Sequence, residues 1–316
     1  MDERERIAML ARTLAARADQ LQGVELGIGD DAAVLVTAHA QARLVWTIDE
    51  QVEGVHFRRD IASWQEIGWR SLMAAVSDVA AMGARPWCAL SALTLPVDVD
   101  DAALERLAQG QRDAGEATGA PVLGGNLAKG SCLSIATTVL GTCSRAVQRR
   151  GARPGNGLWL AGAVGLAAAG LMALDRGMAE HEKLREAVAA WRTPRARVAD
   201  GLAMSCVAQA AVDVSDGLAC DAGHVADASG VRVVFDAAAL LSDEGLLSAA
   251  DVLSVDALEL ALYGGEDYAL VAASDHAIAG FRRVGEIHRG EGVALRDASG
   301  ERAIEPRGYD HFARRA

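Results

Sequence analysis

Residues 27–35, Gly-Ile-Gly-Asp-Asp-Ala-Ala-Val-Leu, place two adjacent carboxylates between a glycine turn and an apolar run. Glycine permits backbone angles that other residues avoid, so Gly27 and Gly29 predict a tight turn. The apolar residues 32–36 then predict a short buried strand. The adjacent charges of Asp30 and Asp31 repel each other unless a cation or water lies close to them. A solvated turn would explain this pair if it stood alone.

Size and charge limit the classes of protein that the chain can form. Its 316 residues, 51% of them hydrophobic, suffice for one large or two ordinary globular domains. A net charge of -12 disfavours a nucleic-acid-binding surface, so a bound polyanion would need divalent cations. The five scattered cysteines form no CxxC pair, and no apolar run reaches bilayer length. We therefore expect a cytoplasmic protein with reduced thiols, no signal peptide and no membrane or nucleic-acid partner.

The pattern of apolar residues predicts mixed helices and strands in the first half of the chain. Helical spacing is found at residues 6–21, 64–82 and 101–118. Strands are predicted at residues 32–36, 44–48, 87–95 and 133–141. The pair Gly124-Gly125 predicts a turn that exposes backbone N–H groups, which can bind phosphate oxygens. This order of elements is typical of an α+β or α/β domain.

A change of composition between residues 144 and 156, with four arginines beside Gly and Pro, marks the predicted domain boundary. The chain then divides into residues 1–144 and 145–316. In the second part, strands are predicted at 158–161, 212–214, 231–235, 269–272 and near 284 and 293. Helices are predicted around 171–174 and at 180–191, 197–210, 218–228 and 257–262. The glycines at 162 and 165 lack a P-loop or Rossmann pattern, so they indicate close strand–helix packing.

Acidic or amide side chains recur at predicted turns and element ends. The six places are Asp30-Asp31, Asp49, Asp78, Asn126, Asp213-Ser215-Asp216 and Glu266-Asp267. Hard oxygen ligands of this kind suit Mg²⁺, which bridges carboxylates to substrate phosphates. A helix cap explains Asp78 equally well when it is taken alone, whereas Asp213 lies inside an apolar strand where no cap is needed. Together they favour metal-assisted phosphoryl transfer without a covalent protein nucleophile.

Seven motifs, in order and over nearly the whole chain, resemble the thiamine-monophosphate kinase family. They are GIGDDAA at 27–33, Asp49 with VEGVHF at 52–57, SDVAAMG at 77–83, Gly124-Gly125, DVSDGL at 213–218, GGEDY at 264–268 and GYDHF at 308–312. The resemblance implies the fold of the aminoimidazole-ribonucleotide synthetase superfamily. In that fold an N-terminal α+β domain pairs with its copy in a homodimer to form a β-barrel, beside a C-terminal α/β domain. It also implies Mg²⁺-dependent transfer of phosphate from ATP to thiamine phosphate, giving thiamine diphosphate.

The same resemblance implies roles for individual residues. The implied magnesium ligands are Asp31, Asp49, Asp78 and Asp213, with Thr47 and Asp216 as additional ones. The implied ATP contacts are Gly125, Asn126, Arg149 and Ser215. The implied thiamine phosphate contacts are His56, Glu266 and Tyr309. Because the acceptor is already a phosphate anion, metals need only relieve the repulsion between the reactants, and no general base is required.

Two departures from the family pattern concern the nucleotide and metal side of this predicted site. Asn126 stands where the family usually has an aspartate after Gly-Gly, and Ile48 stands where it usually has a hydroxyl residue. An amide oxygen can still bind a cation, and Lys129 nearby carries positive charge. Two alternatives therefore stay open. One is a divergent superfamily enzyme with another phosphate or carbonyl substrate, and the other is a catalytically silent homologue that binds nucleotide or thiamine phosphate.

Overall fold

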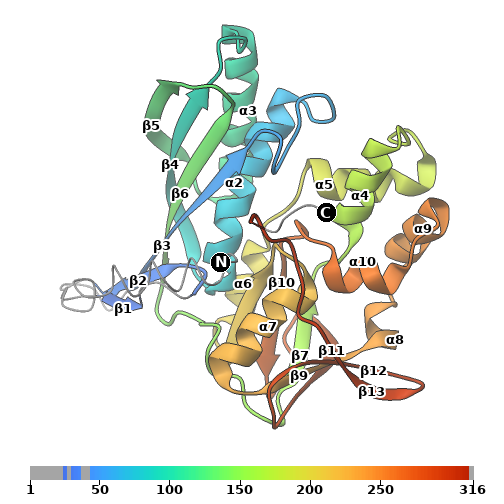
Figure 1. Cartoon of the computed structure of the whole chain (residues 1–316). Coiled ribbons are helices and arrows are strands. Elements are labelled where there is room, and N and C mark those ends of the chain that lie inside the picture. Colours follow the sequence, from blue (N-terminus) through green and yellow to red (C-terminus); the bar gives the residue numbers. More distant parts are fainter. Residues whose placement is uncertain (1–23, 27–29, 37–42, 313–316) are drawn as a thin grey trace.

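A computed structural model describes residues 24–26, 30–36 and 43–312 of the chain. Two β-sheets, each with its own helices, lie side by side in this part of the molecule (Figure 1). The predicted helix at 6–21 and the turn glycines Gly27 and Gly29 lie outside the described residues. No helix in the described ranges has the length and apolar character that crossing a bilayer requires.

The first sheet has six strands in the order β1-β2-β3-β6-β4-β5. The strands are β1 Val24–Leu26, β2 Ala33–Val36, β3 Arg43–Val52, β4 Arg85–Leu95, β5 Val122–Lys129 and β6 Ser134–Cys143. All neighbours pair antiparallel except β4 and β5. Within the described residues this sheet is open, with β1 and β5 at its edges, so a single chain has no closed barrel.

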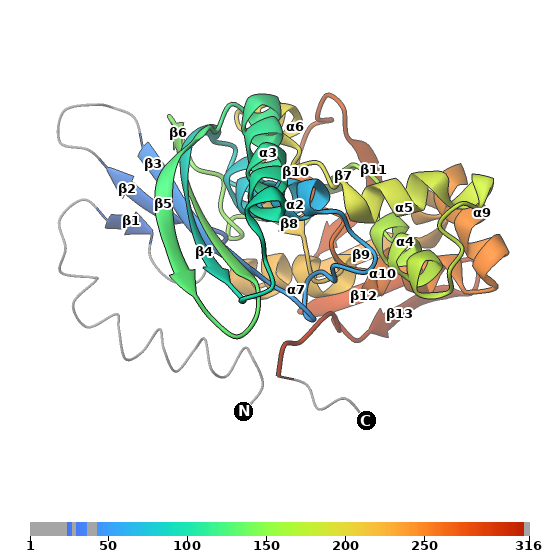
Figure 2. The same ribbon diagram turned by 90° about the horizontal axis from the view of Figure 1, so that it is seen from above.

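Helices α2 (Trp64–Ala81) and α3 (Asp101–Thr118) cover one face of the first sheet, as seen from above in Figure 2. Both were predicted from their spacing. Ser63 caps α2, because its side chain accepts from the Glu66 N–H while Glu66 bonds back to the Ser63 N–H. The two helices approach closely at glycines: a Cβ on Gly68 would lie 2.0 Å from the Leu107 carbonyl oxygen. A larger side chain there would force the helices apart.

The second sheet has seven strands in the order β13-β12-β9-β11-β7-β10-β8. The strands are β7 Gly157–Ala161, β8 Ala210–Val214, β9 Arg232–Asp236, β10 Ala269–Ser274, β11 Arg282–His288, β12 Gly292–Asp297 and β13 Gly300–Ile304. The accompanying helices are α4 Leu166–Asp175, η1 Glu182–Leu184, α5 Arg185–Arg192, α6 Val198–Met204, α7 Leu218–Ser229, α8 Ala237–Leu240, α9 Glu244–Leu253 and α10 Ala257–Tyr263. The divide between the sheets falls between Cys143 and Gly157, and the boundary at 144/145 stays a prediction.

Several predictions from the sequence are wrong in detail. Gly124 and Gly125 do not form a turn but lie inside strand β5. Gly125 is needed there for contact with β4, since a Cβ would lie 1.7 Å from the Ser91 carbonyl oxygen. Helix α6 ends at Met204, well before residue 210. Helices α8 and α9 and strand β13 have no counterpart among the predicted elements.

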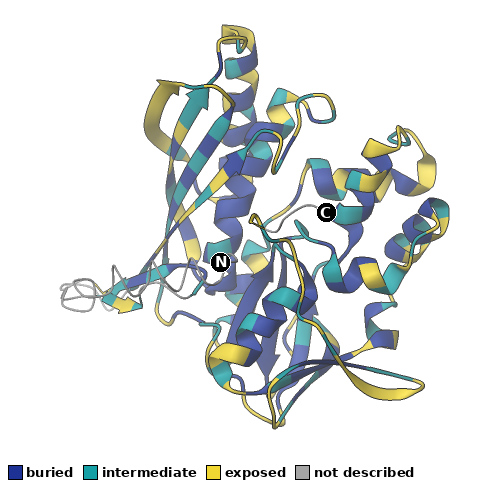
Figure 3. Ribbon diagram, in the orientation of Figure 1, coloured by how far each residue is buried: buried dark blue, intermediate teal, exposed yellow. Residues whose placement is uncertain are grey.

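Helix α2 is the element that connects the two halves. It contacts β3, β4 and β6 of the first sheet and also β8 and α6 of the second half. Thirteen of its 18 residues are buried, as the dark ribbon in Figure 3 shows. Its polar residues Arg70, Ser71 and Ser77 are buried, and their hydrogen-bond partners come from both halves of the chain.

Candidate functional site

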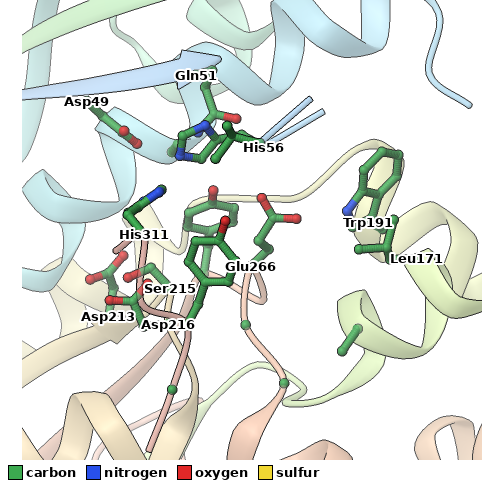
Figure 4. Close-up of a pocket in the computed structure, with 18 of the residues that line it drawn as sticks. Asp49, Gln51, His56, Leu171, Trp191, Asp213, Ser215, Asp216, Glu266 and His311 are labelled. Atoms are coloured by element: carbon green, nitrogen blue, oxygen red, sulfur yellow. The ribbon is translucent and has the colours of Figure 1, made fainter. Parts of the chain in front are cut away.

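A pocket of about 580 Å³ lies between the two sheets, at the level of α2. Eight of the side chains that the sequence singles out line it: Asp49, His56, Asp78, Asp213, Ser215, Asp216, Glu266 and Tyr309. They come from strands β3 and β8, helix α2 and the loops around them (Figure 4). Residues far apart in the sequence therefore face one common cavity.

The carboxylates of the buried Asp31 and Asp213 and of the half-buried Asp78 converge at one end of this pocket. One oxygen each of Asp31, Asp78 and Asp213 lies within 4.8 Å of the others. Thr47 on β3 donates a 2.5 Å hydrogen bond to Asp78 Oδ2. Arg149 is the cation beside the cluster, and its Nε lies 3.0 Å from Asp31 Oδ1. One arginine thus faces three aspartates, which leaves excess negative charge in a buried place.

The pKa values of these carboxyl groups reflect that excess charge. Burial raises the pKa of Asp213 to about 7, with a further contribution from Asp31. Burial also raises the pKa of Asp49 to about 6. The pKa of Asp78 is raised well above its ordinary value by burial and then by Asp213, Asp31 and Asp49. Without a cation, burial and mutual repulsion therefore favour the protonated form of these carboxyl groups.

The donor set fits a hard divalent cation. Asp31 Oδ2 is buried and has no hydrogen-bond partner among the described residues, although a buried carboxylate oxygen normally has one. The surrounding groups are oxygens of Asp78, Asp213 and the Thr47 hydroxyl, with no sulfur or imidazole ligand in this cluster. Such an all-oxygen arrangement is what Mg²⁺ binds in proteins.

The loop before α7 places two further predicted residues at the rim of the cluster. Asp221 Oδ2 accepts hydrogen bonds of 3.1 Å from the backbone N–H groups of Ser215, Asp216 and Gly217. These three bonds fix the loop, so Ser215 and Asp216 are held at the pocket wall. Neither side chain caps α7, whose N-cap residue is Gly217.

Aromatic and imidazole rings form another wall of the pocket. His56 Nδ1 accepts a 3.0 Å hydrogen bond from the Val52 N–H, which fixes the ring. The His311 ring lies 5.0 Å from the His56 ring and 4.8 Å from the Tyr309 ring, measured between centroids. Burial, followed by the charge of His311, lowers the pKa of His56. A neutral His56 leaves Nε2 as the ring nitrogen able to bind a ligand.

Glu266 is held in place by a residue that the sequence analysis missed. Arg70 on α2 forms an ion pair of 2.8 Å with Glu266 Oε1. The available signal was the position of Arg70, three residues from both Ile67 and Met73 on the apolar face of the predicted helix.

Gln51 and Trp191 also line the pocket and were not predicted. For Gln51, the signal was its place two residues after Asp49, on the same side of a strand.

The remaining predicted residues divide into two groups. Asp31, Thr47 and Arg149 do not line the pocket but reach its carboxylates through the contacts described above. Gly125 and Asn126 are exposed on edge strand β5, outside the pocket. Their predicted contact with ATP is not made within the pocket of a single chain, and it stays a prediction.

Known proteins resemble this chain over most of its length. The AIR synthase related protein N-terminal domain matches residues 29–143, and the corresponding C-terminal domain matches residues 153–291. A thiamine-monophosphate kinase of Aquifex aeolicus is 33% identical over 90% of this chain and 92% of its own length. One of Corynebacterium glutamicum is 36% identical over 82% of this chain and 80% of its own.

Solved structures match over a similar extent. The structure of AaThiL complexed with AMPPCP and TMP has a TM-score of 0.89 and 31% identity, covering 98% of this chain and 97% of that one. The two-domain fold expected from the motifs is therefore confirmed. On these grounds of sequence and fold, the chain belongs to the thiamine-monophosphate kinase family.

Proposed function

We propose that this protein transfers the γ-phosphate of ATP to thiamine phosphate, giving ADP and thiamine diphosphate. The observation that carries the proposal is the shared pocket: the carboxylates Asp78 and Asp213 and the acceptor-side residues Glu266, His56 and Tyr309 all line it. The relatives named thiamine-monophosphate kinase, and AaThiL with the ATP analogue AMPPCP and TMP, support the same reaction. The protein would therefore be a transferase, namely a kinase that uses ATP as its co-substrate.

Mg²⁺ would be held by Asp31, Asp78 and Asp213, with Asp49, Asp216 and the Thr47 hydroxyl as further ligands. Bound magnesium supplies charge neutralisation between the two phosphates and the developing negative charge of the transfer. By holding the cations, the carboxylates would set where the anionic ends of both substrates bind. The acceptor oxygen is already ionised near neutral pH, so these residues align reactants and remove no proton.

The other predicted residues orient the substrates. Arg149 and Ser215 would contact ATP, since Arg149 lies at the cluster and Ser215 is on the fixed loop before α7. His56, Glu266 and Tyr309 would bind thiamine phosphate, whose rings carry a cationic thiazolium and hydrogen-bonding nitrogens. Glu266 provides the matching negative charge, and the rings of His56 and Tyr309 provide flat surfaces.

We also propose a homodimer built on the outer face of the first sheet. Five large apolar side chains, each at least 50% exposed, lie on β3, β4 and the start of β5: Trp46, Ile48, Trp87, Leu90 and Leu123. Ile48 and Leu90 point to the same face, because both pair with Thr138 of β6. Exposed apolar side chains gathered on one sheet face are typical of an interface. Pairing two such sheets would form the β-barrel expected of the family. We also propose the cytoplasmic location that the sequence predicts.

Gly125 and Asn126 on β5 remain part of the proposed nucleotide site. They lie on the same exposed edge strand as Leu123 and Leu127, so the proposed dimer would bury their surroundings. Asn126→Asp restores a carboxylate, and a lower half-saturating Mg²⁺ concentration for turnover would support a place near the metal. An unchanged Mg²⁺ dependence would place Asn126 outside the metal shell.

A turnover assay tests the proposed function against its alternatives. Purified protein is incubated with ATP, Mg²⁺ and either thiamine phosphate, thiamine or another phosphomonoester, and ADP and the phosphorylated product are both measured. We expect thiamine diphosphate from thiamine phosphate alone. Tight binding of thiamine phosphate without product would favour a silent homologue. Failure to bind thiamine phosphate would favour a divergent enzyme with another acceptor.

A further inference from the structure

Arg70 is a charged side chain in an unusual place. It lies in the middle of α2 with 1% of its surface exposed, in a protein interior where arginine is rarely fully buried unless it is paired. Its Nε has no hydrogen-bond partner among the described residues. The guanidinium must therefore gain enough from its other contacts to offset the loss of water.

Those contacts all go to residues of the pocket wall. Arg70 forms an ion pair of 2.8 Å with Glu266 Oε1 and donates a 3.2 Å hydrogen bond to the His56 carbonyl oxygen. It also donates to the Trp191 carbonyl oxygen, and its guanidinium lies 4.4 Å from the centre of the Trp191 ring. His56, Glu266 and Trp191 line the pocket, whereas Arg70 does not. Arg70 therefore lies behind the wall and acts on the ligand only through these three residues.

The three partners come from separate segments of the chain. His56 follows β3 in the first half, Trp191 belongs to α5, and Glu266 precedes β10. One guanidinium thus sets the position of acceptor-side groups from both halves. Figure 4 shows His56, Glu266 and Trp191 around the same cavity.

Glu266 needs such support because its backbone is unfavourable. Its φ is 64°, in the left-handed region that side chains other than glycine seldom adopt. Its N–H donates a 2.7 Å hydrogen bond to the Ser215 carbonyl oxygen, and its carboxylate is held by Arg70. Both ends of the residue are thereby fixed, which fits a group that must meet a ligand at one position.

We propose that Arg70 is a positioning residue for the phosphate acceptor, thiamine phosphate. It orients Glu266 and His56 and so sets the affinity for thiamine phosphate without governing the affinity for ATP. This inference rests on the proposed function. The contacts of Arg70 lie on the acceptor side, while the predicted ATP residues Arg149 and Ser215 are not among its partners. Lysine cannot reproduce the arrangement, because an ammonium group lacks the planar fork that binds several acceptors at once.

Arg70→Lys is the first test, with Arg192→Lys as a matched control. Arg192 also bridges the halves, through a 3.0 Å hydrogen bond from Nε to the Ile61 carbonyl oxygen, but does not line the pocket or contact Glu266. We expect Arg70→Lys to raise the KM for thiamine phosphate about tenfold, the effect of losing one charge-assisted interaction, with the KM for ATP within about twofold. Arg192→Lys should leave both KM values near those of the unchanged protein. Equal increases in the two variants, or an increase in the KM for ATP alone, would overturn the inference.

A double-mutant cycle with Glu266→Gln keeps the test decisive if Arg70→Lys lowers stability. If Arg70 acts through Glu266, adding Arg70→Lys to Glu266→Gln raises the KM for thiamine phosphate by much less than tenfold. Fully additive effects would contradict the inference. Melting curves of all variants identify any that fail to fold, and binding of AMPPCP with Mg²⁺ reports an intact nucleotide side. Absence of turnover in the unchanged protein would refute the proposed function instead, which separates the two failures.

Discussion

Ser77 on α2 donates a 2.6 Å hydrogen bond from its hydroxyl to Asp213 Oδ2 on β8, and both side chains are buried. The next residue on the helix is Asp78, which belongs to the carboxylate cluster. This bond therefore fixes helix α2 to the second sheet at the point where the aspartates converge. The metal site proposed above depends on that attachment.

Ser77→Ala should weaken both the fold and the Mg²⁺ response. Removing the hydroxyl leaves Asp213 Oδ2 without its donor, which costs about 1–3 kcal/mol in the free energy of unfolding. A displaced Asp213 should raise the half-saturating Mg²⁺ concentration for turnover. Urea unfolding and a Mg²⁺ titration measure the two effects.

Ser71→Ala is the control for this experiment. Ser71 is buried on the same helix, and its hydroxyl donates 2.8 Å to the Gly68 carbonyl oxygen, away from the carboxylates. It should lose stability while keeping the Mg²⁺ dependence. If Ser77→Ala also left the Mg²⁺ dependence unchanged, the hydrogen bond from Ser77 would not position Asp213 as a magnesium ligand.

Asp78→Asn should make the metal-free protein more stable and the enzyme much slower. The pKa of Asp78 is raised by burial and by three neighbouring carboxylates, so a neutral side chain relieves repulsion in the folded state. Turnover should fall by about 100-fold or more, because electrostatic alignment carries phosphoryl transfer. Melting curves in EDTA and steady-state rates check the two effects. A less stable variant with normal turnover would show that Asp78 has no part in a charged cluster.

The stability of the metal-free protein should fall as pH rises towards neutrality. Burial raises the pKa of Asp49 to about 6 and that of Asp213 to about 7, from 3.8 in an unfolded chain. A raised carboxyl pKa means that the folded state holds its proton more tightly. The contribution of each such carboxyl group to the free energy of unfolding is fully present below about pH 4 and is lost as pH rises through 6 and 7.

Magnesium should reverse this trend, because it binds the deprotonated carboxylates. We therefore expect the increase in melting temperature on adding Mg²⁺ to be small near pH 5 and large near pH 8. Parallel melting curves with EDTA and with saturating Mg²⁺ give this difference directly. A Mg²⁺ effect that is constant across this pH range would mean that these carboxylates do not bind the ion.

The elements around the site were predictable because their sequence signals are local. Helix α3 has the bounds that its amphipathic spacing predicted, and the structure adds that Asp100 caps its start and Gly119 ends it. The motif at 213–218 likewise indicated a strand that ends in carboxylates, and β8 ends at Val214. Where the signal was ambiguous, the prediction was wrong: Gly124-Gly125 is compatible with a turn, but packing against β4 decides for a strand.

Long-range pairing explains what the sequence did not reveal. Nothing next to Arg70 indicates that its partner is Glu266, 196 residues later. The unusual φ of Glu266 likewise accompanies a long-range contact, the hydrogen bond of its N–H to the Ser215 carbonyl oxygen. The convergence of Asp31, Asp78 and Asp213 was expected from the family resemblance, whereas the bonds that hold them required coordinates.

The proposed dimer interface can be broken by a single charge. Leu90→Glu places a carboxylate on the exposed apolar face, and burying it at an interface would be costly. Light scattering should find a dimer for the unchanged protein and a monomer for this variant. Leu247→Glu, at an exposed leucine on α9, should remain dimeric. A monomeric unchanged protein, or a dimeric Leu90→Glu, would contradict the interface.

A single-turnover experiment with ATP labelled in its γ-phosphate tests the central claim most directly. Enzyme in excess over labelled ATP is mixed with thiamine phosphate and Mg²⁺, quenched, and the labelled products are separated. Convergence of the carboxylates on two anionic substrates predicts one labelled thiamine diphosphate for each ADP formed, and none in EDTA. Label found only in inorganic phosphate, or transfer that persists without divalent cations, would contradict the account.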